Sequence, residues 1–272
     1  MRRSHLRPFS WSVNGGTNMP DILSCYKWVV DEAYIRSGSG GALDLSMADY
    51  KISDYDKNAI EEAMLLSEKY HGSTAVITVG LPDDTKGVKD ALSRGPEKAY
   101  FINDSSFADL DPEQTATLLA AAISTSISCD IIICGEGSSD LYAQQVGPRL
   151  AEKLGIPCLC YVQKVELDGS RLVAERKTDE GIEVVAVELP VLLTVVPDIN
   201  TPRLPGLRDT LAAGKKPVVE FTADDLPPLN GAILKTTASK ASSISRGGRI
   251  FGADAGGIGD LIQELKNSGV IA

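Results

Sequence analysis

The stretch of this sequence with the most chemical potential is GEGSSDLYAQQVGPRLAEKLG, residues 135–155. It follows an apolar run at 130–134 and leads into an amphipathic segment, which predicts a strand, a loop and a helix over 141–154. Free backbone N–H groups at the start of a helix attract anions such as phosphate. Yet the loop carries two carboxylates, Glu136 and Asp140, and it lacks both a dinucleotide-binding fingerprint and a phosphate-directed lysine.

Two interpretations of this loop stay open on the residues alone. In the first, Ser139 or Asp140 is an ordinary N-cap of the following helix. In the second, the backbone amides hold a phosphate, while Asp140 caps the helix or accepts a hydrogen bond from a ribose hydroxyl. Glu136 comes too early in the loop to cap the helix and is expected to be solvated.

Other strand ends should approach the same loop, because ligands of open parallel sheets bind at the carboxyl ends of the strands. One such end carries Cys25 and Lys27, and another carries Gly80, where the missing side chain lets a flat ring come close to the backbone. Ser53 and Asp54 stand at a further helix start and cap it, with ligand contact as a second role.

The elements that must position these residues alternate between strand and helix over the first 155 residues. Strands are predicted at 21–30, 74–80, 98–102 and 130–134, and helices at 55–71, 85–93, 112–127 and 141–154. The strands are short, nearly continuous apolar runs, which indicate a parallel sheet covered on both faces.

The pattern changes after residue 157. A hairpin is predicted around Asp168-Gly169, joining strands at 161–167 and 171–177. Strands at 182–188, 191–196 and 217–221 follow, with an exposed proline-marked loop at 200–217 that leads into a short helix. The remaining tail is polar and ends in an amphipathic helix at 258–266, so we expect it to lie against another surface.

Composition excludes several classes of function. The net charge of −10 argues against nucleic acid and anionic membranes as partners. No run of 18 apolar residues is present, so no membrane insertion is expected. Five cysteines and two histidines leave little material for a metal site or a serine–histidine–aspartate triad, and the odd cysteine count suits reduced thiols in the cytoplasm. Residues 1–18 lack the apolar core of a signal peptide and are expected to be a disordered leader.

Several runs together resemble the β subunit of electron transfer flavoproteins, above all the Fix-type members of anaerobic carnitine and fatty-acid metabolism. The resemblance extends in order from about residue 21 to the end. It rests on CYKWVVDE at 25–32, KISDYDKNAIEEA at 51–63, LSRGP at 92–96, GEGSSDLYAQQVGPRLAEKLGIP at 135–157 and ELPVLLTVVPDINTPRLPGLRDTLAAGKKP at 188–217.

The resemblance implies a fold and a division of the chain. The expected fold is α/β, a mostly parallel, doubly wound sheet of the adenine-nucleotide α-hydrolase-like kind, with a β-hairpin insertion and a C-terminal arm. Residues 19–226 would form the nucleotide-binding domain. Residues 227–272 would form the arm, whose terminal helix packs on the α subunit.

It also implies a nucleotide site in the β subunit, which holds AMP in the common type and a second FAD in electron-bifurcating members. The implied contact residues are Cys25, Ser53, Asp54, Tyr55, Asp56, Gly80, Gly135, Gly137, Ser138, Ser139, Asp140, Gln144, Gln145, Val146 and Gly147. Ser53 stands where many members have asparagine, and Leu141-Tyr142-Ala143 replaces the Gly-Asp-Thr of bifurcating members, so both nucleotides stay open.

The implied function is electron carriage and not catalysis. The electron-carrying FAD would be bound mainly by the α subunit of a heterodimer. Electrons would pass between acyl-CoA dehydrogenase-type enzymes and a quinone oxidoreductase or ferredoxin. Leu207 matches the leucine that anchors the family's recognition loop on the dehydrogenase; without the resemblance, packing of Leu204 or Leu207 on their own helix would be the simpler interpretation.

Two alternative functions explain less of the sequence. A stand-alone adenine-nucleotide-binding regulator of stress-protein-like fold would use the same loop but would leave the 200–217 loop and the arm unexplained. A Mg²⁺-dependent hydrolase or kinase lacks a phosphate-directed lysine, a histidine base and a clear carboxylate cluster.

Overall fold

The computed structural model describes residues 19–38, 41–241 and 248–271, so the leader predicted at 1–18 lies outside the described residues. The chain forms two compact units. The first comprises the residues up to Arg36 together with Leu45–Thr237, and the second comprises Ser37–Asp44 and Ala238–Ala272. The boundary expected after residue 226 falls within the first unit.

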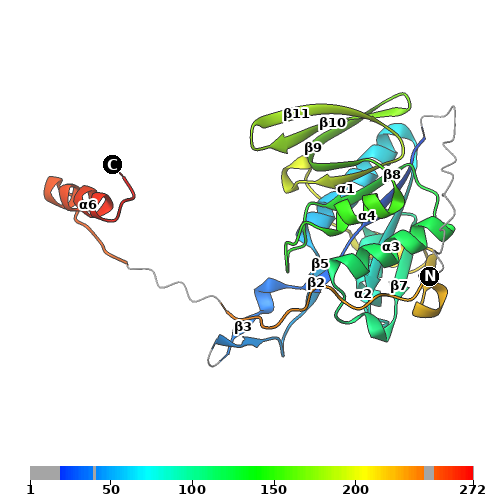
Figure 1. Ribbon diagram of the computed structural model, residues 1–272, viewed down its shortest axis with the longest axis horizontal. Helices are drawn as coiled ribbons and strands as arrows, with labels where there is room; N and C mark the ends of the chain where they lie inside the picture. Colours follow the sequence, from blue (N-terminus) through cyan, green and yellow to red (C-terminus); the bar gives the residue numbers. More distant parts are fainter. Residues whose placement is uncertain (1–18, 39–40, 242–247, 272) are drawn as a thin grey trace, which may run out of the picture. The chain divides into compact units, whose positions relative to one another are not determined.

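A single mixed sheet organises the first unit (Figure 1). Within the described residues its nine strands lie in the order β11-β10-β9-β12-β8-β1-β6-β7-β13. Neighbours from β9 to β13 run parallel, whereas β9, β10 and β11 pair antiparallel. The bounds are β1 Asp21–Cys25, β6 Ser73–Gly80, β7 Lys98–Asn103, β8 Ile131–Gly135, β9 Cys158–Asp168, β10 Arg171–Thr178, β11 Gly181–Glu188, β12 Val191–Val195 and β13 Val218–Phe221.

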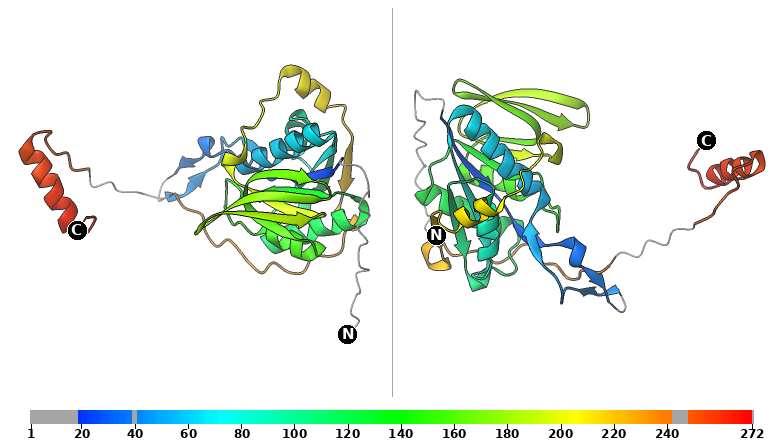
Figure 2. Two further views of the ribbon diagram at one scale, coloured as in Figure 1. Left: turned by 90° about the horizontal axis from the view of Figure 1, so that it is seen from above. Right: turned by 180° about the vertical axis from the view of Figure 1, so that it is seen from behind.

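Helices cover both faces of this sheet (Figure 2). On one face, α1 (Asp54–Tyr70) packs Ala59, Ala63 and Leu66 against apolar side chains of β1, β8 and β12, and α2 (Thr85–Ser93) lies on the same side. On the other face, α3 (Pro112–Ser126) and α4 (Val146–Leu154) pack against alternate residues of the same strands, such as Leu23 and Ile132. The predicted α/β class with a mostly parallel, doubly covered sheet is therefore confirmed.

Local signals explain where several helices begin and end. Asp111 accepts a hydrogen bond from the Gln114 N–H and Gln114 accepts one from the Asp111 N–H, which forms a capping box around Pro112 at the start of α3. His71 adopts a left-handed conformation that ends α1. The hairpin predicted around Asp168-Gly169 joins β9 to β10, with Gly169 at φ 64°.

The single first strand predicted at 21–30 is wrong, because the chain leaves the large sheet after Cys25. The Tyr26 N–H still bonds the Ile77 carbonyl, but the Lys27 N–H bonds a carboxylate instead of a neighbouring strand. Residues Trp28–Val30 form β2, which pairs antiparallel with β5 (Tyr50–Ile52) in a separate two-stranded sheet.

The remaining elements are short or belong to the second unit. β3 (Arg36–Ser37) and β4 (Leu43–Asp44) form another two-stranded sheet, and α5 (Leu207–Ala213) follows the exposed loop. In the second unit, α6 (Ala255–Asn267) is capped by Asp254, whose carboxylate accepts a hydrogen bond from the Gly257 N–H. Of the helices that the structure describes, none combines the length and the apolar character required to cross a bilayer.

Candidate functional site

The order of the strands creates a topological switch point beside β1. The chain runs from β1 to β6 and β7 on one side and then returns to place β8 on the other side of β1. Connections that turn in opposite directions open a crevice at the carboxyl ends of two such strands. Here that position is taken by Tyr26-Lys27 after β1, the start of α1, and the loop 136–145 after β8.

Asp56 joins all three of these segments. It lies in the first turn of α1 and is buried. One carboxylate oxygen accepts the Lys27 N–H at 2.8 Å and the other accepts the Gly135 N–H at 3.2 Å. Burial, only partly offset by these hydrogen bonds, raises the pKa of Asp56 to about 7.

Two serines tie the loop to the same helix start. The Ser139 N–H donates to the Ser53 Oγ at 3.2 Å, and the Asp54 N–H donates to the Ser139 Oγ at 3.2 Å. Ser53 occupies the N-cap position of α1, but its side chain makes no capping hydrogen bond there. Its hydroxyl serves the loop instead, which the capping rule alone does not predict.

Each carboxylate of the loop has a side-chain partner. Asp140 pairs with the Lys27 ammonium at 2.5 Å; burial opposes its ionisation, but hydrogen bonds from Lys27 and Ser138 hold its pKa below the ordinary value. Glu136 accepts a hydrogen bond from the Tyr142 hydroxyl at 2.6 Å, which raises the pKa of Tyr142 to about 12. The charge of Asp140 is therefore offset by Lys27. Glu136 is held by a hydrogen bond, so the expectation that it is simply solvated is wrong.

The helix predicted to begin at Leu141 begins at Val146. Tyr142 and Gln144 have φ angles of 47° and 56°, which a right-handed helix cannot contain. The N-cap position falls on Gln145, without a side-chain capping bond. The expected capping role of Ser139 or Asp140 is therefore wrong.

This irregular loop leaves main-chain donors open. Among the residues that the structure describes, the N–H groups of Gly137, Val146 and Gly147 donate to no protein acceptor. Val146 and Gly147 are the first two residues of α4, where the helix dipole favours an anion. Gly147 has to be glycine, because a Cβ there would lie 2.6 Å from Thr194 Cγ2. These donors suit a phosphate better than any side chain present.

Most of the predicted site residues lie in this cluster. The rings of Tyr55 and Tyr142 lie 5.1 Å apart, centroid to centroid, in a tilted arrangement. Gln145 accepts hydrogen bonds from the Arg149 guanidinium. A Cβ on Gly135 would lie 2.7 Å from the Asp56 carboxylate. The cluster thus brings together Ser53 to Asp56 and Gly135 to Gly147.

Two predicted residues lie apart from the loop. Cys25 is buried beneath the sheet edge among the residues packed by α3 and α4, where its thiol contacts Cys134. Gly80 ends β6, and a Cβ there would lie nearest to Asp84 and Phe101. Among the described residues, no hydrogen bond joins Cys25 or Gly80 to the loop 136–145.

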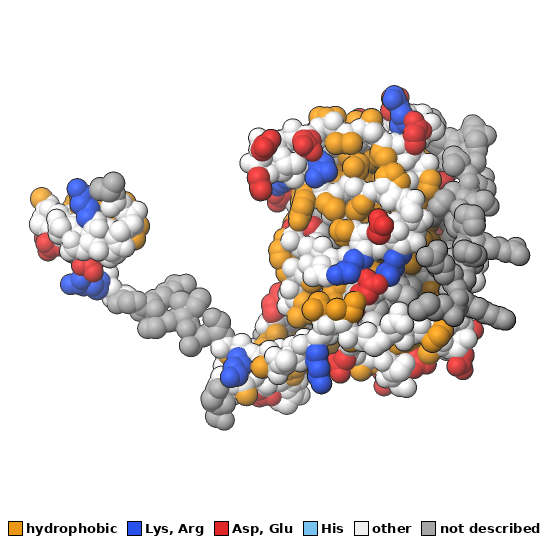
Figure 3. Space-filling view, in the orientation of Figure 1, with side chains coloured by type: hydrophobic (Ala, Val, Ile, Leu, Met, Phe, Trp, Pro, Cys, Tyr) orange, Lys and Arg blue, Asp and Glu red, His pale blue; other side chains and the backbone are white. Residues whose placement is uncertain are grey.

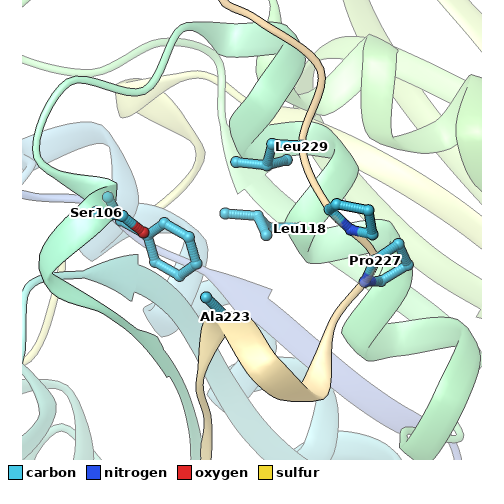
Figure 4. Close-up of a pocket in the computed structure, with 7 residues that line it drawn as sticks. Ser106, Leu118, Ala223, Pro227 and Leu229 are labelled. Atoms are coloured by element: carbon cyan, nitrogen blue, oxygen red, sulfur yellow. The ribbon is translucent and has the colours of Figure 1, made fainter.

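A separate small cavity of about 110 Å³ lies further along the same edge (Figure 4). Its walls come from the ends of β7 and β13, from α3 and from the chain after Leu226, and Figure 4 shows Leu118, Leu229 and Pro227 facing it. The lining consists of Ser106, Phe107, Leu118, Ala223, Pro227, Pro228 and Leu229. It is almost wholly apolar and offers no charged group to a ligand.

A polar cluster on α1 was missed from the sequence. Glu61 and Glu62 of α1 are buried. Glu61 accepts hydrogen bonds from the Arg203 guanidinium and N–H, and Glu62 accepts one from Asn200. Asn58 donates to the Pro197 and Asn200 carbonyls. The partners are about 140 residues apart, so no local pattern could have revealed them.

This cluster fixes the loop that presents three leucines to solvent. Leu204, Leu207 and Leu211 are 91%, 78% and 67% exposed. Leu207 begins α5, and Gly206 precedes it with its N–H bonded to Asp209. Packing of Leu204 or Leu207 on their own short helix is therefore wrong as an account of these side chains.

The fold and this cluster define an open α/β protein of the class that binds ligands at the carboxyl edge of its sheet. A family model, described as the electron transfer flavoprotein domain, matches residues 42–226, well over half of the chain. The chain belongs to the electron transfer flavoprotein family. Proteins of this family are flavin-linked electron carriers and not catalysts, and they work with partner subunits and dehydrogenases.

Proposed function

We propose that this chain is the β subunit of a heterodimeric electron transfer flavoprotein of the Fix type, acting in the cytoplasm. The heterodimer passes electrons between an acyl-CoA dehydrogenase-type enzyme and a quinone oxidoreductase or ferredoxin. Its electron-carrying FAD is held mainly by the α subunit. This chain contributes a second adenine nucleotide, AMP or another FAD, and the partner-docking loop.

One observation carries the nucleotide proposal. At the switch point, the open N–H groups of Gly137, Val146 and Gly147 face a site whose nearby carboxylates are already paired. Phosphate would be held by these main-chain donors and by the hydroxyls of Ser138 and Ser139, in place of a lysine. Asp140 would keep its ion pair with Lys27 and remain available to a ribose hydroxyl.

The exposed leucines support docking to a dehydrogenase. An apolar side chain on a loop that is already fixed loses little conformational entropy when it binds a pocket. Arg203 and Asn200 anchor this loop to α1, so Leu207 is presented in a defined position. The C-terminal arm, with α6, would complete the contact to the α subunit.

Subunit identity is tested by co-expressing the chain with the α subunit and purifying the complex through a tag on this chain. We expect a one-to-one heterodimer that carries flavin. Recovery of a homodimer that does not bind the α subunit, and that binds ATP without it, would favour the stand-alone regulator instead. That alternative shares the loop but gives no role to the three exposed leucines.

Docking is tested by Leu207→Ala in the purified heterodimer. We expect electron transfer from the dehydrogenase to fall by about tenfold or more, since a central apolar anchor contributes on the order of 2 kcal/mol. Flavin content should be unchanged. Ile182→Ala, which truncates another largely exposed apolar side chain, on edge strand β11, serves as the control. Loss of flavin in Leu207→Ala would show that this residue is structural and not a docking anchor.

A further inference from the structure

Strand β9 contains an irregularity next to the candidate site. Leu159 pairs with Leu193 and Val162 pairs with Val195, so Cys160 and Tyr161 together lie opposite Thr194. This is a β-bulge, and Tyr161 adopts a left-handed φ of 61°. Bulges re-aim side chains and cluster near functional sites, and a left-handed conformation at a tyrosine is uncommon.

The bulge accompanies a close pair of thiols. Cys158 and Cys160 have their Sγ atoms 3.7 Å apart, and both side chains are only partly buried. Thr194 links the pair to the bulge, because its hydroxyl oxygen accepts the Tyr161 N–H at 3.2 Å and its hydroxyl hydrogen-bonds the Cys160 sulfur.

The two sulfurs are chemically different. Hydrogen bonds from Cys158 and Thr194, together with the nearby Arg176 cation, hold the pKa of Cys160 below the ordinary value for a thiol. The hydrogen bond to Cys160 and burial raise the pKa of Cys158. Cys160 therefore loses its proton more readily than Cys158 does. Thiolates are the nucleophilic form of cysteine.

The other three thiols provide an internal contrast. Cys25, Cys129 and Cys134 are buried. Burial raises the pKa of Cys129 to about 12, and a hydrogen bond with Cys25 together with burial raises that of Cys134. Buried thiols of raised pKa are inert, so reactivity should be confined to β9.

We propose that Cys158 and Cys160 form a reversible dithiol–disulfide site that reacts with low-molecular-weight disulfides. The Cys160 thiolate attacks one sulfur of the external disulfide, whose S–S bond breaks and releases one thiolate. Cys158 then loses its proton and attacks the Cys160 sulfur, which releases the second thiol. Two protein thiols are oxidised, one external disulfide is reduced to two thiols, and the two protons pass to the products.

The geometry allows this bridge and keeps it reversible. The sulfurs must approach from 3.7 Å to about 2.05 Å, which side-chain rotation on neighbouring same-face positions can supply. A disulfide that spans a single residue is strained, and strained bridges are readily reduced. The inference rests on β9 and its neighbouring strands and does not depend on the proposed function.

The test equilibrates the full-length protein with glutathione buffers from fully reduced to fully oxidised, followed by acid quenching, alkylation and tryptic mass spectrometry. Cleavage after Lys153 and Lys164 releases one peptide that holds Cys158 and Cys160 and no other cysteine. In reducing buffers we expect this peptide to be doubly alkylated. As the buffer is oxidised, it should be replaced by an unalkylated form that is two hydrogens lighter than the free dithiol, and the doubly alkylated form should return on reduction. A peptide that stays fully alkylated throughout would overturn the proposal.

Single substitutions assign the two roles. Cys158→Ser should accumulate a glutathione adduct on Cys160, because the second step is lost. Cys160→Ser should leave Cys158 unmodified under the same conditions, and Cys129→Ser should behave as the unaltered protein. Equal reaction of Cys158 and Cys160 in these variants, or of Cys129 in the unaltered protein, would contradict the assignment.

Discussion

At the scale of single residues, Asp56 holds the candidate site together. Its two oxygens accept the N–H groups that follow β1 and end β8, and its backbone belongs to α1. A buried carboxylate whose acceptors are both used is a positioning group and not a ligand for phosphate. The carboxylate also explains why Gly135 cannot carry a side chain, since a Cβ would meet it at 2.7 Å.

The raised pKa of Asp56 predicts a pH dependence of stability. The folded pKa of about 7 exceeds the value of an unfolded chain, so between about pH 4 and pH 7 only the folded chain binds this proton. The stabilisation is therefore present at low pH and is lost as pH rises through 7. Asp56→Asn cannot titrate, so the stability of the native protein relative to this variant should fall by about 2–3 kcal/mol from pH 5 to pH 8.

Urea denaturation of both proteins at the two pH values measures this difference. Groups other than Asp56 titrate in both proteins and cancel in the comparison. An identical difference at pH 5 and pH 8 would mean that Asp56 ionises with its ordinary pKa.

At the scale of elements, α1 joins the two regions for which we propose a function. Its first turn carries Asp56 of the candidate site. Its middle carries Glu61, which accepts hydrogen bonds from Arg203 of the loop before Leu207. Arg203 also reaches Glu68, two turns further along α1, at 2.7 Å. One rigid helix therefore sets the position of both regions within the first unit.

Removing Arg203 should loosen this connection. Arg203→Leu leaves the buried Glu61 without its main partner, and an unpaired buried acceptor costs about 1–3 kcal/mol. Lys177→Leu removes an exposed ion pair with Asp198 and should change stability by less than about 1 kcal/mol. Urea denaturation at neutral pH compares the two variants. Equal losses would show that the Arg203 pair is no more than a surface contact.

The sequence predicts the regular elements better than the site loop. The helix expected at 85–93 matches Thr85–Ser93, because an apolar face and a closing Arg94-Gly95-Pro96 define it locally. Helix α4 begins five residues later than the sequence predicts, because Tyr142 and Gln144 adopt left-handed conformations. Tyr142 contacts Glu136 and Tyr55, and these contacts cannot be recognised from a local pattern. Likewise, the burial of Glu61 depends on a partner about 140 residues away.

At the scale of the whole molecule, the second unit has little core of its own. Helix α6 contains no buried residue among those described, and Ile258, Leu261 and Ile262 are exposed on it. Figure 3 shows apolar side chains at the surface of this unit. An exposed apolar stripe on an amphipathic helix indicates a binding face. This agrees with the proposal that the arm contacts the α subunit.

Truncating the apolar side chains of α6 should weaken binding of the α subunit without changing the stability of the first unit. We expect Ile258→Ala, Leu261→Ala and Ile262→Ala, combined in one chain, to reduce recovery of the α subunit severalfold. The unfolding free energy of the first unit should stay within about 0.5 kcal/mol, because surface substitutions rarely exceed this. The control combines Asp260→Ala, Gln263→Ala and Lys266→Ala on the same helix. Full recovery of the α subunit with the apolar variant would exclude α6 as a contact.

The central claim is that the loop after β8 holds an adenine nucleotide in addition to the FAD of the heterodimer. Ser138→Glu places a carboxylate beside the open N–H groups, whereas Ser105→Glu makes the same change in the loop after β7. The most direct measurement counts nucleotides released from each purified heterodimer by chromatography. We predict FAD plus one further adenine nucleotide in the native protein and in Ser105→Glu, and loss of only the further nucleotide in Ser138→Glu. A native heterodimer with a single nucleotide, or a Ser138→Glu variant that retains both, would contradict the account.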